Sequence, residues 1–172
     1  MASGDNQNRT NRASLLGASG ILNRLIGCTT GGDLYTFAHR TLTTQTDATL
    51  NDSDKTFNVP IDHLWWIHSI FVLLITSATA GNRRILLTVR ADSIDDSYHL
   101  SASTTQPSNQ SRRYNMMPGV ERGSFVDDQL VMPIPPRLLI PNSAAVRVRD
   151  VNAVDPTADD MTVSLVYDDI SV

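Results

Sequence analysis

The stretch "LWWIHSIFVLLITSATAGNRRILLTVRAD", from Leu64 to Asp92, decides the fold of this chain. Its apolar part, Leu64 to Ile75, is too short for a membrane-spanning helix, which takes about 20 residues. The Thr, Ser and Gly-Asn residues that follow are typical of a turn, and "RRILLTVRAD" alternates apolar and polar side chains like a half-buried strand. The sequence therefore predicts two adjacent strands joined at residues 80–82. A buried helix at 64–75 is the alternative.

As a strand, this apolar segment has two apolar sides. One side carries Leu64, Trp66, Ile70, Val72 and Leu74, and the other carries Trp65, Ile67, Phe71, Leu73 and Ile75. One side can fill the core of a sandwich. The other would expose a patch on the order of several hundred Å², which is rare on soluble monomers. We therefore expect a contact with another subunit to cover the second side.

Short segments with strand-like alternation and Pro, Gly or Asp turns recur along the rest of the chain. They comprise residues 33–43, 96–103, 112–119, 129–136, 145–151 and 161–169. In the last segment, the side chains expected to point inward are Met161, Val163, Leu165 and Tyr167. About eight short strands with almost no helix favour an all-β fold, a jelly-roll-like antiparallel β-sandwich with an extended N-terminal arm. We place the arm at residues 1–32 and the sandwich at 33–172.

The N-terminal arm differs from the rest in pattern and charge. Residues 1–14 are polar, whereas residues 15–26 place Leu15, Ala18, Leu22, Leu25 and Ile26 on one helical face. A helix this short is marginal alone, so we expect it to become ordered on a partner. The arm has a net charge of +2 in a chain of net charge −4, which leaves −6 for the remainder. A basic arm suits an acidic neighbouring surface, and a solvated tail is the alternative.

These two features define the candidate partner interface. Its residues are Arg9, Arg12, Leu15, Leu22, Arg24, Leu25, Ile26, Trp65, Ile67 and Phe71.

Motifs of catalysis and of cofactor binding are absent from the sequence. It has no Gly-X-Ser-X-Gly elbow, no phosphate-binding loop and no dinucleotide fingerprint. Cys28 is the single cysteine, and the four histidines, His39, His63, His68 and His99, form no close metal-binding pair. The acidic clusters at 92–96 and 155–160 offer oxygen ligands for calcium but lack the glycine and glutamate of an EF-hand loop. We expect no enzymatic activity, no cofactor and no metal.

The sequence gives only weak indications of other classes of ligand. The mild net charge and the scarcity of aromatic residues between basic ones argue against nucleic acid. Trp65 and Trp66 are a candidate sugar-stacking platform, although their apolar context favours a core or interface role. The polar N-terminus has no secretory signal pattern, which predicts synthesis in a reducing cytoplasm.

From Trp65 to Tyr167 the chain resembles a group of small structural proteins of tailed bacteriophages. The resemblance lies in the order of "WWIHSIFVLLITSATAGNRRILLTVRAD", "YNMMPG", "PIPPRLLIPNSAAVRVRD" and "ADDMTVSLVY", and residues 1–50 lie outside it. It implies a β-sandwich component of the virion, attached to the head or the head–tail region, and it carries over no functional residue.

The resulting hypothesis is a capsid decoration or cement protein, made in the host cytoplasm and located in the virion. It would bind the assembled head through the major capsid protein or other virion proteins, as a homo-oligomer with a trimer favoured. We expect no nucleic-acid or membrane partner. A collar, connector or tail accessory protein of the same virion is one alternative. A carbohydrate-binding module for host attachment is another.

Overall fold

The computed structural model describes most of the 172-residue chain. The described residues are 26–28, 34–36, 40–90, 96–123 and 125–171. Every regular element among them is a β-strand, as predicted, and none of them forms a helix long and apolar enough to cross a membrane. The buried-helix alternative for residues 64–75 is therefore wrong.

The chain divides into two compact units, Met1–Phe37 and Ala38–Val172. In the first unit, β1 (Ile26–Cys28) pairs antiparallel with β2 (Leu34–Thr36). Ile26 therefore begins a strand, and its predicted place at the end of an amphipathic helix over residues 15–26 is wrong. The rest of the predicted helix lies outside the described residues.

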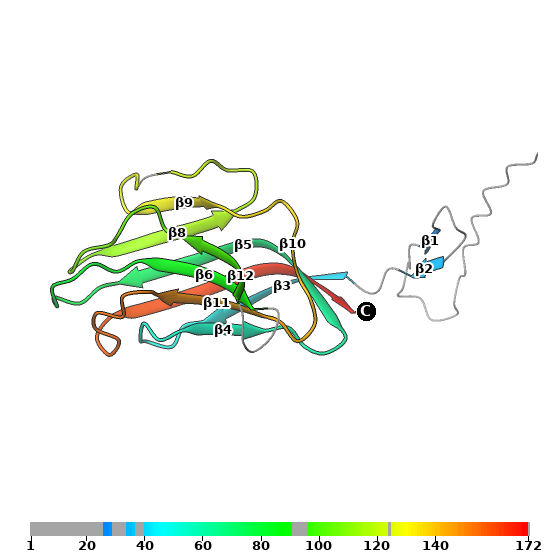
Figure 1. Cartoon of the computed structure of the whole chain (residues 1–172), viewed down its shortest axis with the longest axis horizontal. Coiled ribbons are helices and arrows are strands. Elements are labelled where there is room, and N and C mark those ends of the chain that lie inside the picture. The colour runs from blue at the N-terminus through cyan, green and yellow to red at the C-terminus, as the bar shows by residue number, and fades with distance from the viewer. Residues whose placement is uncertain (1–25, 29–33, 37–39, 91–95, 124, 172) are drawn as a thin grey trace, which may run out of the picture. The chain divides into compact units, whose positions relative to one another are not determined.

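The second unit is a sandwich of two sheets (Figure 1). The larger sheet has the order β3 (Arg40–Asp47), β12 (Asp160–Ser171), β5 (His63–Ile75), β8 (Ser111–Met117) and β9 (Gln129–Pro133), and β10 (Leu138–Ile140) also pairs with β5. The smaller sheet has the order β4 (Lys55–Asn58), β11 (Ala145–Asp150), β6 (Ile85–Arg90) and β7 (Asp96–Ser101).

The connections between these strands make the sandwich a jelly roll. Neighbouring strands are mostly far apart in sequence: β12 lies between β3 and β5, and β11 lies between β4 and β6. The chain crosses from one sheet to the other at β3–β4, β4–β5, β5–β6, β7–β8, β10–β11 and β11–β12. All strand pairs are antiparallel except β8 with β9. Two facing sheets of six and four strands, interleaved in this way, are jelly-roll-like, which confirms the predicted all-β sandwich.

The core lies between the inner faces of the two sheets, and it follows the alternation seen in the sequence. On β12 the buried side chains are Met161, Val163, Leu165 and Tyr167, as predicted. On β11 they are Val146 and Val148, opposite the β6 residues Val89 and Leu87 in the antiparallel register. Period-two burial of this kind fixes the register, because a slip of one residue would turn every apolar side chain outward.

The predicted hairpin of adjacent strands joined at residues 80–82 is wrong in one respect. Both strands exist, but β5 belongs to the larger sheet and β6 to the smaller one, so they face each other across the core. The Gly-Asn turn signal marks a chain reversal without determining whether the two strands share hydrogen bonds. Gly81 has φ +149°, and a Cβ at this position would lie 2.7 Å from Val154 Cγ1.

A buried ion pair holds this crossing connection in place. Arg83 and Asp159 are both fully buried, with Nε to Oδ2 at 2.6 Å and Nη2 to Oδ1 at 3.0 Å. Arg83 Nη1 donates to the carbonyls of Thr79 and Gly81, and the Ser77 backbone N–H donates to Asp159 Oδ1 at 2.6 Å. Because its remaining groups are hydrogen-bonded, the pair is compatible with burial and ties the β5–β6 connection to the start of β12.

Candidate interaction surface on the larger sheet

The two sides of β5 have different environments. Its inner side contributes Trp65, Ile67, Ile70, Val72 and Leu74 to the core, all of them buried. Its outer side, which faces away from the smaller sheet, carries Leu64, Trp66, Phe71, Leu73 and Ile75, which are half-buried or exposed. The predicted strand with two apolar sides is therefore present, and among the described residues of the second unit no other sheet covers the outer side.

The division of residues between the two sides differs from simple alternation because of a β-bulge. Val166 of β12 pairs with Ser69, whereas the next residue, Tyr167, pairs with Ile67, so His68 is an extra residue in β5. A bulge shifts the residues on one side of it by one position relative to those on the other. Trp65 and Ile67 therefore fall on the same side as Ile70.

This bulge changes the candidate partner interface. Trp65 is 3% exposed and Ile67 is 0% exposed, so both belong to the core and their expected contact with a partner is wrong. The Trp65 ring packs against the Tyr167 ring with centroids 4.3 Å apart. Phe71 does lie on the outer side, half-buried. The sugar-stacking platform loses Trp65 for the same reason.

A polar cluster that the sequence analysis missed lies beside the bulge on the outer side. Asp168 of β12 is buried, and its Oδ2 accepts hydrogen bonds from Arg40 Nε at 2.5 Å and from His68 Nε2 at 2.7 Å. The Arg40 guanidinium also lies over the Trp66 ring, 4.6 Å from its centroid. Trp66 and His68 have ring centroids 5.5 Å apart. One carboxylate on β12 thus positions groups from β3 and β5.

The charge state of Asp168 follows from these contacts. Burial opposes ionisation of the carboxyl group, but the hydrogen bonds from Arg40 and His68 outweigh it and hold the pKa of Asp168 below its ordinary value. Asp168 is therefore ionised near neutral pH and offsets the positive charge of Arg40. The cluster presents an aromatic ring and a neutralised ion pair to the outside of the sheet.

Apolar side chains surround this cluster in rows across the sheet. Leu42, Asp168, Trp66 and Leu139 are successive cross-strand neighbours on β3, β12, β5 and β10, and Leu42 and Leu139 are 67% and 48% exposed. We call the whole surface the outer apolar face. It consists of Leu42, Leu64, Trp66, Phe71, Leu73, Ile75, Leu139, Val166 and Ile170.

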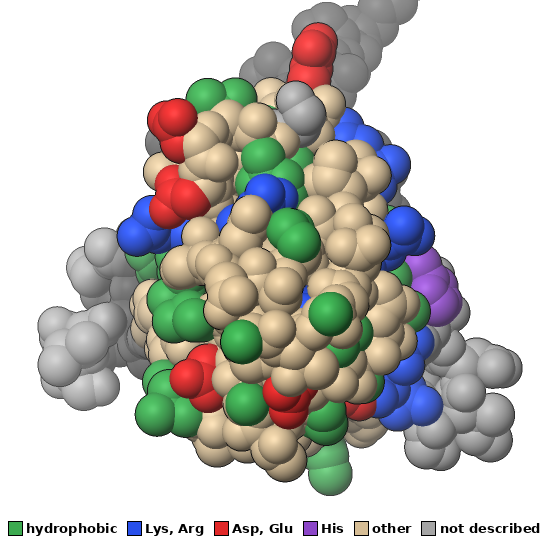
Figure 2. Space-filling model, turned by 90° about the vertical axis from the view of Figure 1, so that its left-hand side faces the viewer, with side chains coloured by type: hydrophobic (Ala, Val, Ile, Leu, Met, Phe, Trp, Pro, Cys, Tyr) green, Lys and Arg blue, Asp and Glu red, His purple; other side chains and the backbone are tan. Residues whose placement is uncertain are grey.

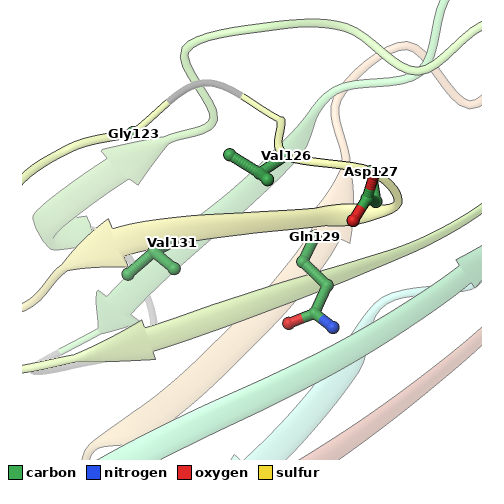
Figure 3. Close-up of a pocket in the computed structure, with 5 residues that line it drawn as sticks. All are labelled: Gly123, Val126, Asp127, Gln129 and Val131. Atoms are coloured by element: carbon green, nitrogen blue, oxygen red, sulfur yellow. The ribbon is translucent and has the colours of Figure 1, made fainter.

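A small pocket lies at the edge of the same sheet. It has a volume of about 330 Å³ and is lined by Gly123, Val126, Asp127, Gln129 and Val131, from β9 and the loop that precedes it (Figure 3). The loop is held against β9 by a hydrogen bond from the Gly123 N–H to the Val131 carbonyl at 3.2 Å. The lining offers one carboxylate and one amide but no nucleophile paired with a base, so it suggests no reaction.

The acidic residues considered as calcium ligands have other partners. Asp159 binds Arg83, and Asp155 accepts hydrogen bonds from Ser77 Oγ and Thr79 Oγ1. Within the described part of the chain, no group of three or more His, Cys, Asp or Glu side chains is arranged to hold a metal ion. Asp92 and Asp95 of the other acidic cluster lie outside the described residues, as do Arg9, Arg12, Leu15, Leu22, Arg24 and Leu25 of the arm.

Comparisons with known proteins add little to this geometry. No family model matches the chain, and no curated protein matches it. A solved structure titled "Structure of infectious bursal disease virus Gx strain" aligns with a TM-score of 0.26 and 8% sequence identity. The alignment covers 85% of this chain and 43% of that one, so this chain spans less than half of the length of that protein. At this TM-score the alignment supports no functional inference.

Proposed function

We propose that this chain is a structural virion protein of a tailed bacteriophage, a capsid decoration or cement protein that binds the assembled head as an oligomer and stabilises it. The observation that carries the proposal is the outer apolar face, on which Leu42 and Leu139 are exposed and Trp66 is half-buried. Apolar faces of this kind mark interaction sites on soluble proteins. The proposal includes no catalytic step.

Other copies of this chain are the occupants that fit the outer apolar face best. Its central charges cancel, because Asp168 is paired with Arg40 and His68. A neutral apolar surface can meet its own copy without repulsion between like charges, whereas a strongly charged one cannot. We assign this face to contacts within a homo-oligomer, with a trimer favoured.

The basic arm would make the contact with the major capsid protein. Residues 1–32 carry a net charge of +2 and a short amphipathic segment. Binding would order this arm on the shell at an entropic cost. The bound chain would then stabilise the shell by mass action, because it binds the assembled state and not the dissociated one.

The test is to add the purified chain to head particles that lack it and to locate it by electron cryomicroscopy. We expect density at regular positions on the head surface and a higher temperature of head disruption. A chain that lacks residues 1–32 should keep its folded sandwich and lose this density. Density at the collar or tail would favour the accessory-protein alternative, and no bound density at all would refute the proposal.

A further inference from the structure

The outer face of the smaller sheet concentrates positive charge. Along β6 the inward side chains are Ile85, Leu87 and Val89, and along β11 they are Val146 and Val148. The alternate positions point outward and carry arginines. We define the arginine face as Arg84, Arg90, Arg147 and Arg149, together with Arg122, whose guanidinium reaches the Ser101 carbonyl at the end of β7 from the loop before β9.

This concentration contrasts with the acidic charge of the whole chain. The net charge is −4, yet five of the 14 Lys and Arg residues lie on this face. Figure 2, which looks onto the end of the sandwich drawn on the left in Figure 1, shows basic side chains gathered along its right-hand margin. A local positive field on an acidic protein attracts negatively charged partners to one side of the molecule.

Carboxylates among the described residues satisfy only part of this charge, and Arg90, whose cross-strand neighbour is Asp96, has a partner. Arg147 forms an ion pair with Asp54, and Arg122 donates to the carbonyl of Ser101. Among the described residues, Arg84, Arg122 and Arg149 have no carboxylate within ion-pair distance.

Two neighbouring guanidinium groups on this face repel each other. Burial lowers the pKa of Arg147, and the positive charge of Arg149 lowers it further. An anion placed between these two side chains would relieve their repulsion. The Arg147–Asp54 pair shows that a carboxylate is accommodated at this position.

Two buried polar atoms on the same face also lack partners. Thr88 points outward between Arg147 of β11 and His99 of β7, is fully buried, and its hydroxyl group has no hydrogen-bond partner. Arg149 Nε is also buried without an acceptor. Donors removed from water without an acceptor are unfavourable, so these two groups lower the stability of this sheet.

We propose that the arginine face binds an acidic segment of a partner protein in an extended conformation. Arg147 and Arg149 are two residues apart on one strand, which spaces them about 6.5–7 Å apart. An extended peptide with carboxylates at alternate positions has the same spacing. Arginine binds carboxylates through two parallel hydrogen bonds, which adds geometric selectivity to the attraction of charges.

A protein partner fits this face better than nucleic acid does. Single-stranded nucleic acid is normally held by aromatic side chains that stack on its bases as well as by basic groups. The outward positions of β4, β6 and β11 carry Asn, Thr, Leu, Ala and Arg but no Phe, Tyr or Trp. The arginine face and the outer apolar face lie on opposite sheets of the sandwich, so both can be occupied at once. This proposal does not depend on which protein covers the outer apolar face.

Fluorescence anisotropy with the purified chain tests the proposal. The probe is a fluorescein-labelled peptide of alternating Glu and Ser, measured at low and high salt. We expect Arg84→Glu and Arg149→Glu each to weaken binding about tenfold or more, since each change replaces an attraction by a repulsion. The matched control is Arg137→Glu, an exposed arginine between β9 and β10, which should change the affinity less than about twofold. Arg149 is half-buried, and its replacement can affect folding. Arg84 is exposed, so Arg84→Glu keeps the fold intact and tests the proposal independently.

Three results would overturn the proposal. The first is the absence of peptide binding to the unmodified chain at millimolar peptide and low salt. The second is an equal loss of affinity in Arg137→Glu, which would show that only net charge matters. The third is tighter binding of a single-stranded oligothymidylate with the same number of negative charges, abolished by the same two variants. That result would assign the face to nucleic acid.

Discussion

His68 Nε2 lies 2.7 Å from Asp168 Oδ2, across the two central strands of the larger sheet. The same oxygen accepts from Arg40 Nε of the edge strand at 2.5 Å. A single carboxylate therefore links β3, β5 and β12 at the place where β5 bulges, and it holds Arg40 above the Trp66 ring.

We predict that Asp168→Asn lowers the free energy of unfolding by about 1–2 kcal/mol at pH 7, because two charge-assisted hydrogen bonds are weakened. The loss is no larger because Arg40 is partly exposed, and solvent screens its interaction with Asp168. The pKa of Asp168 is held below its unfolded value, so its stabilising contribution is present above that value and is lost as the pH falls through the folded pKa. Urea denaturation between pH 2 and 7 measures both effects. The difference between the two proteins should shrink at low pH. As a control, Asp128→Asn affects only an exposed pair with Arg113 and should change stability by less than about 1 kcal/mol.

Asp52 has the opposite pH dependence. It is 4% exposed, neither carboxylate oxygen has a hydrogen-bond partner, and burial together with the charge of Asp150 raises its pKa to about 6. The folded state therefore binds a proton more tightly than the unfolded state, and stability falls as the pH rises from about 4 through 6. We predict that Asp52→Asn is more stable than the unmodified chain by about 1–3 kcal/mol at pH 8, and that the two converge below about pH 4. Equal stability at pH 8, measured by urea denaturation, would contradict this prediction.

The outer apolar face can be tested with residues whose replacement leaves the isolated sandwich intact. Leu42 and Leu139 are largely exposed, so Leu42→Asp and Leu139→Asp remove little from the core. We predict that the unmodified chain is an oligomer and that the double variant is a monomer with an unchanged circular dichroism spectrum. Size exclusion with light scattering measures both. The matched control is Ile61→Asp, an equally exposed apolar residue in the β4–β5 connection, which should stay oligomeric. A monomeric unmodified chain would contradict the assignment.

The buried Arg83–Asp159 pair gives the largest expected stability effect. Arg83→Ala leaves the Asp159 carboxylate buried without its partner, which should cost about 3–5 kcal/mol. The double variant Arg83→Met with Asp159→Leu removes both charges and should recover a large part of this loss. Arg113→Ala, at an exposed pair, serves as the control with an expected change below about 1 kcal/mol. If the double variant were no more stable than Arg83→Ala, the unpaired Asp159 carboxylate would not be the cause of the lost stability.

Alternation in the sequence predicted the sandwich, because core burial imposes the same period on each strand separately. It placed Met161, Val163 and Leu165 inward, as the structure confirms. The placement of Trp65 and Ile67 failed because the bulge at His68 arises from pairing with β12, about one hundred residues later, and local alternation carries no sign of it.

The polar cluster on the larger sheet could not be predicted from the sequence, for a related reason. Arg40, His68 and Asp168 are brought together only by the pairing of three strands that are remote in sequence. One signal was present, since His68 lies in a mostly apolar strand and a polar group partly removed from water favours a hydrogen-bond partner. The partner itself could not be chosen among 18 acidic residues without the register.

The position of β12 between β3 and β5 has a consequence for how the chain acquires its structure. The larger sheet cannot close until residues 160–171 have left the ribosome, because β3 and β5 have no hydrogen bonds to each other. Contacts of such high sequence separation slow folding, since a long loop must close before the pairing stabilises it. The sandwich is therefore incomplete until β12 has been synthesised, and during that interval the apolar strand β5 is the segment most in need of protection by chaperones.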